Sequence, residues 1–222
     1  KIDDLIPDIG NDISRFIGNK DSLTDVKCTC VRSNGSKFPA EIYISLVKLE
    51  NTIMYCFVIH DISKKERAEL CLKTIRKVQE MYISGLDKKI IFEYILSFLI
   101  DFTNSEYGFI GEILVKDNAP YLKTTAITNI ALDDNTRDFF TQHHQDGIQF
   151  HNLNTLIEYT IKTGDPVVFN DPKHAPRSGG VPKGYPKLNS YIGVPIQGSE
   201  GMVAMFGLAN CKTGYNKYLL QE

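Results

Sequence analysis

The stretch SYIGVPIQGSEGMVAMFGLA, residues 190–209, decides the fold of the second half of the chain. Its two apolar runs, Ser190–Ile196 and Met202–Ala209, have the length and composition of buried β-strands. Between them, Gln197–Gly201 contains two glycines, and glycine adopts the positive backbone angles of tight turns without steric cost. The stretch therefore predicts a β-hairpin.

Strand and helix patterns alternate on the N-terminal side of this hairpin. Asp87 follows Gly85 and is placed to cap a helix. One face of that helix carries the apolar residues Ile91, Ile95, Phe98 and Phe102, with Leu99 beside them. The later segments predict strands at Tyr107–Val115 and Tyr121–Ile127, helices at Asn135–Gln145 and Leu153–Thr163, a short strand at Val167–Phe169 and a Pro/Gly-rich loop at Asp171–Pro186. Strands with helices inserted between them predict an α+β fold, with helices on the faces of a sheet.

A helix is also predicted from Ser63 to Ser84, a segment without Gly or Pro in which Ser63 is placed to cap the first turn. A four-three spacing puts five residues on one stripe: Ala68, Leu72, Ile75, Gln79 and Tyr82. Two hypotheses stay open for this stripe, which is too short to establish a coiled coil. It is either the seam of a homodimer or the side by which the helix packs on its own domain.

Residues 22–61 predict an antiparallel meander of three strands. The first alternates around Val26, the second around Ile42, and the third, 52–59, is rich in β-branched and aromatic residues. Asn34-Gly35 predicts the first hairpin turn, and Glu50-Asn51 the second.

Composition and charge exclude several classes of partner. Apolar residues make up 42% and charged residues 23% of the chain, which is typical of a soluble globular protein. The formal net charge of −2 creates no global field that would attract nucleic acid or an anionic membrane surface. The longest apolar run, Ile90–Phe102, is broken by Glu93 and Asp101 and falls short of the roughly 18 residues that span a bilayer. We expect no nucleic-acid partner and no membrane span in this segment.

Cysteine usage indicates a reducing compartment. The cysteines are odd in number, scattered and without a Cys-x-x-Cys pair: Cys28, Cys30, Cys56, Cys71 and Cys211. Cys28 and Cys30 face the same side of one strand, yet such neighbours lie too far apart for an unstrained disulfide. The N-terminal residues carry no export signal. We therefore expect a cytoplasmic protein.

Two motifs in the first third of the chain resemble the second half of a PAS domain. Residues 31–42, VRSNGSKFPAEI, resemble the Arg-x-x-Gly-x-x-Phe-Pro-x-Glu pattern of that family. Residues 60–69, HDISKKERAE, resemble its Asp-Ile-Thr ending and charged exit helix. The resemblance implies that residues 1–62 are the C-terminal part of a PAS domain and that 63–86 form a connecting signalling helix.

The rest of the chain resembles a GAF domain. Residues 164–168, GDPVV, and 190–196, SYIGVPI, are similar to its two most recognisable stretches. Residues 176–186, PRSGGVPKGYP, resemble a loop of GAF domains from bacterial multi-sensor histidine kinases and diguanylate cyclases, and Gly207–Asn210 with Gly214-Tyr215 resemble the strand and turn before the last helix. The resemblance implies a GAF domain at 87–222, with a central antiparallel sheet flanked by helices and a truncated last helix.

Together the two resemblances imply the sensory input module of an intracellular signal-transduction protein, such as a two-component histidine kinase or a diguanylate cyclase. A small-molecule or redox signal would pass through the helix to an output domain. The chain has neither a kinase nucleotide-binding glycine motif nor a diguanylate cyclase signature, so we expect no enzyme activity by itself. The partners implied are a second copy of the chain, through helix 63–84, and an unidentified small molecule.

The ligand is expected in a cavity between the sheet and the layer of helix and loop around Leu153–Gly184. His174, Arg177 and Lys183 in the loop are candidates for meeting an anionic ligand, because nearby glycines allow close backbone approach and a guanidinium holds a carboxylate or phosphate at two points. Tyr107 and Phe109 are further ligand-binding candidates. The alternative is a solvated loop with ordinary surface charge.

Other kinds of site are disfavoured. Adjacent His143 and His144 diverge on a helix and cannot easily share an ion, so no metal site is expected. The sequence indicates no particular cofactor and no catalytic residue. Some GAF domains bind cyclic nucleotides through an Asn-Lys-Phe-Asp-Glu set, of which only Asn210 matches, since Cys211 and Tyr215 replace the Lys and Phe.

Two alternatives to a sensor remain open. One is a small-molecule reductase on a GAF scaffold, but such enzymes use cysteines near the pocket and only Cys211 lies in this part of the chain. The other is a GAF domain that binds nothing and serves only for dimerisation.

Overall fold

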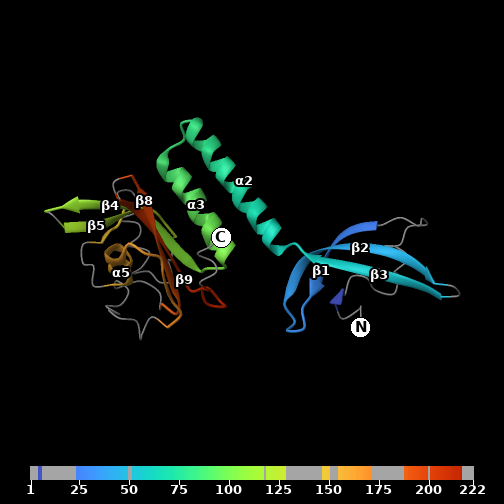
Figure 1. Ribbon diagram of the computed structural model, residues 1–222. Coiled ribbons are helices and arrows are strands. Elements are labelled where there is room, and N and C mark those ends of the chain that lie inside the picture. The colour runs from blue at the N-terminus through green and yellow to red at the C-terminus, as the bar shows by residue number, and fades with distance from the viewer. Residues whose placement is uncertain are drawn as a thin grey trace, which may run out of the picture. The chain divides into compact units, whose positions relative to one another are not determined.

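The computed structural model describes residues 5–6, 24–49, 52–117, 119–128, 147–150, 155–171, 188–199 and 201–216 (Figure 1). The chain divides into two compact units, Lys1–Lys73 and Thr74–Glu222, and the α+β class with antiparallel sheets is confirmed. No helix in the described part of the chain is long and apolar enough to cross a membrane.

The first unit contains the predicted meander. Its sheet has the order β1-β2-β3, formed by β1 (Thr24–Val31), β2 (Lys37–Leu49) and β3 (Thr52–Asp61), all antiparallel. Side chains from one face make the core with Ile6: Cys30, Phe38, Ala40, Ile42 and Ile44. Gly35 has φ 81°, as the Asn-Gly turn requires, whereas Glu50-Asn51 lies outside the described residues. The sulfurs of Cys28 and Cys30 are 4.0 Å apart, about twice a disulfide bond length, so no disulfide joins them and one thiol lies within hydrogen-bond distance of the other.

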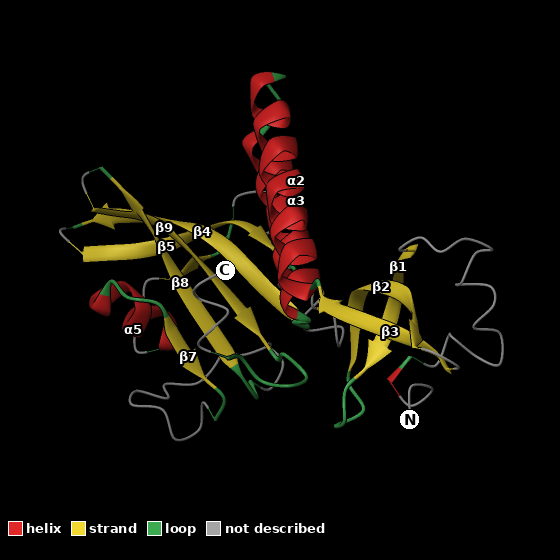
Figure 2. Ribbon diagram, turned by 45° about the vertical axis from the view of Figure 1, so that its right-hand side comes forward, coloured by secondary structure: helices red, strands yellow, loops and turns green. Residues whose placement is uncertain are grey.

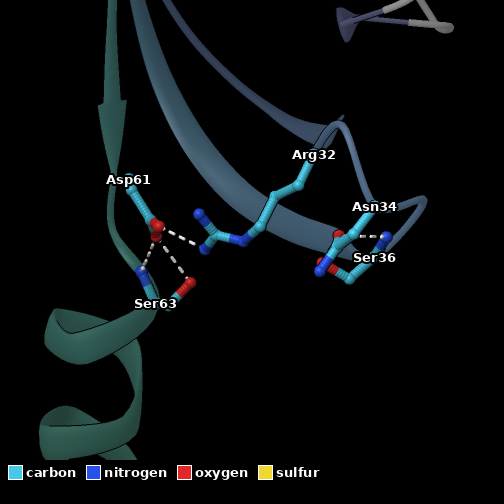
Figure 3. A network of polar contacts seen from close by, with 5 residues as sticks. All are labelled: Arg32, Asn34, Ser36, Asp61 and Ser63. Atoms are coloured by element: carbon cyan, nitrogen blue, oxygen red, sulfur yellow. Dashed lines mark hydrogen bonds and ion pairs between the residues drawn. The ribbon is translucent and has the colours of Figure 1, made fainter.

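A polar network joins this sheet to α2 (Ser63–Ile83), and Figure 3 shows it from close by. Asp61 accepts hydrogen bonds from the Ser63 backbone N–H at 2.9 Å and from the Ser63 hydroxyl at 2.6 Å, and it pairs with Arg32. The prediction that Ser63 caps the helix is therefore wrong, because its hydroxyl donates to Asp61 instead of accepting from the first turn. The Arg32 guanidinium also lies 4.2 Å from the centre of the Phe38 ring, which connects the turn, the core and the helix start.

The second half of α2 runs beside α3 (Lys88–Thr103) in opposite direction, as Figures 1 and 2 both show. In this half Thr74 and Met81 are buried and Val78 is half-buried, a set with the spacing of a helical stripe. The predicted stripe is offset from it by one residue and points to solvent, with Leu72, Ile75 and Tyr82 exposed by 54%, 52% and 76%. The stripe is thus not the side by which α2 packs on its own chain.

Asp87 caps α3 as predicted, since its carboxylate accepts a hydrogen bond from the Lys89 N–H at 2.7 Å. The helix ends at Asn104, whose φ of 52° lies in the left-handed region. Ile91 and Leu96 are its buried residues, and Leu96 was not part of the predicted face.

The second unit is built on a six-stranded antiparallel sheet with the order β6-β5-β4-β9-β8-β7. In chain order its strands are β4 (Tyr107–Lys116), β5 (Ala119–Ile127), β6 (Gln149–Phe150), β7 (Val167–Phe169), β8 (Tyr191–Gly198) and β9 (Gly201–Ala209). The predicted hairpin is β8–β9, whose register shifts after Ile196 and ends with Gly198 opposite Gly201. The two-residue strand β6 was not predicted, and the predicted helix Asn135–Gln145 lies outside the described residues.

Helices cover both faces of this sheet (Figure 2). Ile110, Ile192 and Leu208 pack with Leu96 of α3 on one face. Tyr191 and Val167 pack with Leu156 of α5 (Leu156–Thr163) on the other. Because neighbouring residues of a strand point to opposite faces, Tyr191 and Ile192 assign α5 and α3 to opposite sides of the sheet.

Candidate functional site

The sheet face that α5 covers, called the α5 face below, has small residues at its centre. In register across β4, β9, β8 and β7, one row contains Phe109, Gly207, Gly193 and Val167. The next row contains Tyr107, Ala209, Tyr191 and Phe169. Three adjoining positions, Gly207, Gly193 and Ala209, therefore have at most a methyl group as side chain. Aromatic or branched side chains surround this patch of the sheet.

Tyr191 and Phe109 lie over the glycines of this patch. A Cβ atom on Gly207 would lie 2.5 Å from Phe109 Cε1 and 3.1 Å from Tyr191 Cε2. A Cβ atom on Gly193 would lie 2.9 Å from Tyr191 Cε1. These separations are shorter than any normal carbon–carbon contact, so the two rings approach the backbone as closely as glycine alone permits.

Two hydroxyl groups meet above Gly193. A Cβ atom there would lie 2.4 Å from the Thr160 Oγ1 and 2.7 Å from the Tyr191 hydroxyl oxygen. Thr160 is fully buried on α5 and donates its hydrogen to the Leu156 carbonyl, with an oxygen–oxygen distance of 3.1 Å. The Tyr191 hydroxyl is buried as well and lies beside the Thr160 hydroxyl. It makes no hydrogen bond of normal geometry there.

Burial raises the pKa of Tyr191 well above its ordinary value, so its hydroxyl stays protonated at neutral pH. Because the buried Tyr191 hydroxyl has no hydrogen-bond partner among the described residues, its hydrogen is available to an acceptor. Burial and the neighbouring Glu106 carboxylate raise the pKa of Tyr107 to about 12, so this ring is neutral too.

One ion pair lies on α5. Glu158 is buried on the helix, and its carboxylate forms an ion pair with Lys162 one turn later. The described residues contain no group of three His, Cys, Asp or Glu side chains placed to hold a metal ion. The described part of the α5 face thus presents apolar side chains and neutral hydroxyls.

The structure places two of the five predicted ligand-binding residues. Tyr107 and Phe109 both point to the α5 face, from neighbouring rows. His174, Arg177 and Lys183 lie outside the described residues. Tyr191, Thr160 and Gly193 were not predicted, although one signal was visible: Gly193 and Gly207 stand almost symmetrically about the turn and so face each other.

The remaining cysteine candidate lies elsewhere. Cys211 is buried on the α3 side of the sheet, and its sulfur is 3.5 Å from the Thr213 hydroxyl. It shares neither the face nor the cluster of Tyr191.

Comparison with known families identifies the second unit. The GAF domain family matches residues 85–221, which is more than half of the chain. The chain belongs to the GAF domain family. GAF domains are commonly sensory or regulatory modules in signalling proteins. No curated protein matches the chain.

Solved structures are similar to the chain at low sequence identity. The GAF domain of a phosphoenolpyruvate-protein phosphotransferase (ptsP) from Coxiella burnetii is 10% identical, with a TM-score of 0.52 over 68% of this chain and 83% of that chain. The A. aeolicus nlh2 GAF domain in an inactive state is 18% identical, with a TM-score of 0.44 over 68% and 86%. The type II free methionine-R-sulfoxide reductase from Thermoplasma acidophilum is 16% identical, with a TM-score of 0.40 over 57% and 77%. At these identities the likeness concerns the GAF fold alone.

Proposed function

We propose that this chain is the sensory input module of a cytoplasmic signalling protein, in which the GAF unit binds a small molecule and α2 relays the signal. The carrying observation is the buried Tyr191 hydroxyl, which has no well-formed hydrogen bond among the described residues and lies over the paired glycines. A buried donor without a good acceptor costs free energy, and a ligand that brings an acceptor recovers it.

The ligand proposed is a small molecule with an apolar or planar body and a carboxylate or phosphate group. The body would contact Tyr107 and Phe109, whose rings border the glycine patch. The anionic group would meet Arg177, whose planar guanidinium can bind two oxygens at once. Its neighbours His174 and Lys183 are the further candidates for that end of the ligand.

Mass spectrometry of the purified, undenatured chain tests this proposal, because a retained ligand appears directly as added mass. Arg177→Ala should then weaken its binding by about 2 kcal/mol, roughly thirtyfold, if the contact is desolvated. Lys187→Ala, just beyond the loop glycines, is the matched control. Equal affinity of both variants would remove Arg177 from the site. A chain that retains nothing, and whose melting temperature no carboxylate or phosphate metabolite raises, would contradict ligand binding.

Self-association through α2 is a second proposed role, favoured by the exposed stripe. Leu72, Ile75 and Tyr82 keep more than half of their surface in contact with solvent, and their four-three spacing is self-complementary in a pair of identical helices. We propose that a second copy of the chain covers the stripe. Light scattering should show a dimer for the parent and a monomer for Leu72→Glu/Ile75→Glu, because charges are not tolerated in a packed apolar seam. A monomeric parent at high concentration would contradict it.

The last part of the proposal concerns the identity of the first unit and of the full-length protein that contains this chain. We propose that residues 1–62 are the C-terminal part of a PAS domain, that 63–86 connect it to a GAF domain at 87–222, and that the host is a histidine kinase of a two-component system or a diguanylate cyclase. The three-stranded sheet before the GAF unit and the Arg32–Asp61 pair at the start of α2 support the first assignment. Expression of residues 1–86 alone, followed by circular dichroism, tests whether that part folds without a preceding segment.

The reductase alternative is less well supported. A reductase of this kind needs an accessible thiolate in the pocket, and Cys211 is buried in the cluster on the α3 side. We therefore propose that the module has no enzyme activity by itself. A thiol titration that showed fast modification of Cys211 in the folded chain would argue for the reductase.

A further inference from the structure

Cys28 and Cys30 place two thiols side by side on the core face of β1. Their sulfurs are 4.0 Å apart, and either thiol can donate to the other. The two residues differ in access, because Cys30 is fully buried in the core beside Phe38 and Ala40, whereas Cys28 is half-buried. A reagent that approaches the sheet therefore meets Cys28 first, with the second sulfur already next to it.

Two neighbouring thiols can bind a soft metal ion or be oxidised to a disulfide. A structural zinc ion needs four ligands in a tetrahedral arrangement. Within the described residues, no group of three His, Cys, Asp or Glu side chains is placed to hold a metal ion. Oxidation needs only the two sulfurs and an oxidant, so the geometry favours a redox-active pair over a metal site.

A disulfide between these two residues would contract β1. Residues two apart on a strand have Cα atoms about 6.4–6.8 Å apart, at the upper end of the range that disulfides span. Closing the bond brings the sulfurs from 4.0 Å to about 2 Å, so the strand must twist or shorten locally. A strained bridge is easily reduced again, which suits a reversible signal in a reducing compartment better than a permanent cross-link.

The row of residues that contains Cys28 leads across the sheet to the start of α2. Cys28 on β1 faces Ala40 on β2, and Ala40 faces Asp61 on β3. Asp61 accepts hydrogen bonds from the Ser63 N–H and hydroxyl at the beginning of the helix. Ala40 is fully buried and has only a methyl group, so a shift of β1 reaches β2 without a long side chain that would absorb it.

The row that contains Cys30 leads to the same place through Arg32. Cys30 faces Phe38, and the Arg32 guanidinium lies 4.2 Å from the centre of that ring. Arg32 follows Cys30 by two residues and pairs with Asp61 (Figure 3). A contraction of β1 between its two cysteines therefore displaces both partners of this ion pair.

We propose that Cys28 and Cys30 are an oxidation site, at which a hydroperoxide converts the two thiols into a disulfide that loosens the attachment of α2 to the sheet. The Cys28 thiolate attacks the peroxide bond; one oxygen stays on its sulfur as a sulfenic acid, and the other leaves with the Cys28 proton as an alcohol or water. The Cys30 sulfur then attacks the Cys28 sulfur, and the hydroxyl group leaves with the Cys30 proton as water. Two electrons pass from the sulfurs to the peroxide bond. This chemistry is independent of the ligand site on the α5 face, and only its effect relies on the relay role proposed for α2.

Trypsin provides a direct test, because cleavage after Lys27 and Arg32 releases both cysteines in one peptide, residues 28–32, without any other cysteine. The folded chain is treated with hydrogen peroxide, its remaining thiols are alkylated, and the peptide is weighed by mass spectrometry. We expect a form that is lighter by two hydrogen atoms, resists alkylation and is converted back by dithiothreitol. Absence of the bridged peptide, or a bridge that forms in urea but not in the folded chain, would overturn the proposal.

Three variants, each checked for folding by circular dichroism, separate this site from nonspecific oxidation. Cys30→Ala should stop at the sulfenic acid of Cys28, which dimedone labels, because the second sulfur is missing. Cys28→Ala should slow the modification of the buried Cys30 at least about tenfold. Cys56→Ser, at an exposed position of β3, is the control and should leave the yield of the bridge unchanged. Equally fast modification of Cys28 and Cys30 in the single variants would contradict the order of attack.

Hydrogen exchange tests the effect on α2. In the oxidised parent chain, the amides of a peptide covering 61–69 should exchange at least about threefold faster than in the reduced chain, and Cys30→Ala, treated in the same way, should show no such change. Faster exchange confined to 24–32 would overturn the coupling to α2. Uniformly faster exchange throughout 24–69 would overturn it as well, since the bridge would then simply unfold the sheet.

Discussion

Substitution of Gly193 by alanine examines the tight packing of the α5 face. The new methyl group would start 2.4 Å from the Thr160 Oγ1 and 2.7 Å from the Tyr191 hydroxyl oxygen. Both side chains are buried, and the Thr160 hydroxyl is held by the Leu156 carbonyl, so neither can withdraw into solvent. Overpacking of a well-filled site costs about 1–3 kcal/mol, and for a chain of this size each kcal/mol lowers the melting temperature by about 2–4 °C.

The assay is urea unfolding followed by circular dichroism, with Gly198→Ala as the matched control. A methyl group on Gly198 would meet Val203 Cγ1 at 2.6 Å, but Val203 is 50% exposed and can turn away, so this variant should stay within about 0.5 kcal/mol of the parent. Gly193→Ala combined with Thr160→Ala should lose about 1 kcal/mol less than the sum of the single variants, because the methyl group then occupies the vacated space. Equal stability of Gly193→Ala and the parent would refute the inferred packing above the glycines.

The remaining predictions concern ionisation. Hydrogen bonds from the Ser63 hydroxyl and N–H, followed by the Arg32 pair, lower the pKa of Asp61 from 3.8 to about 2. Its contribution to stability is therefore present above about pH 4 and is lost as the pH falls towards 2; a carboxyl titration by NMR checks this, and a Ser63→Ala variant should titrate closer to 3.8. Burial raises the pKa of Tyr107 from 10.0 to about 12, so stability that is complete below pH 10 should be lost as the pH rises towards 12. Phenolate absorbance measures this step, and a folded chain whose tyrosines all ionise near pH 10, as they do in urea, would contradict it.

Local patterns predicted the elements of this chain well. The strand Val167–Phe169 has the predicted bounds, and the predicted hairpin and helix 63–84 are within one or two residues of β8, β9 and α2. These segments have a clear period or a turn residue that fixes their ends, as Asp87 does for α3. Strand β6 has two residues and no pattern of its own, since it exists only by pairing with Leu122 and Lys123.

The predicted apolar stripe of α2 shows that a periodic pattern does not determine which side of a helix is buried. A spacing of four and three residues occurs twice on α2, once through Leu72 and Ile75 and once through Thr74, Val78 and Met81. The first stripe is the more apolar, yet the second is the one buried. Which stripe is buried depends on the direction that the chain takes after the turn at Gly85. The sequence of α2 alone does not contain that information.

The α5 face was predictable only in part for a related reason. Tyr107 and Phe109 could be predicted as site residues because they are aromatic residues on a strand. Tyr191 lies within residues 190–196, which served only as evidence for the fold. Its role comes from register: Gly193 pairs with Gly207, and Gly207 pairs with Phe109, so the two central positions of this row carry no side chain. The pairing of Phe109 with Gly207 joins segments that are distant in sequence, which a single strand pattern does not encode.

Asn210 satisfies two requirements, a left-handed backbone conformation and a pair of side-chain hydrogen bonds. Its φ of 59° is tolerated by glycine and asparagine better than by other residues, so the backbone alone would accept glycine. Glycine, however, would supply neither the acceptor for the Asn189 N–H nor the donor to Glu106. Asn104, at the end of α3, has a similar φ of 52°, but its side chain has no comparable pair of bonds among those described. The two residues look alike in sequence and backbone, yet Asn210 uses its side chain to connect Asn189 with Glu106, so its role follows from side-chain contacts and not from the backbone alone.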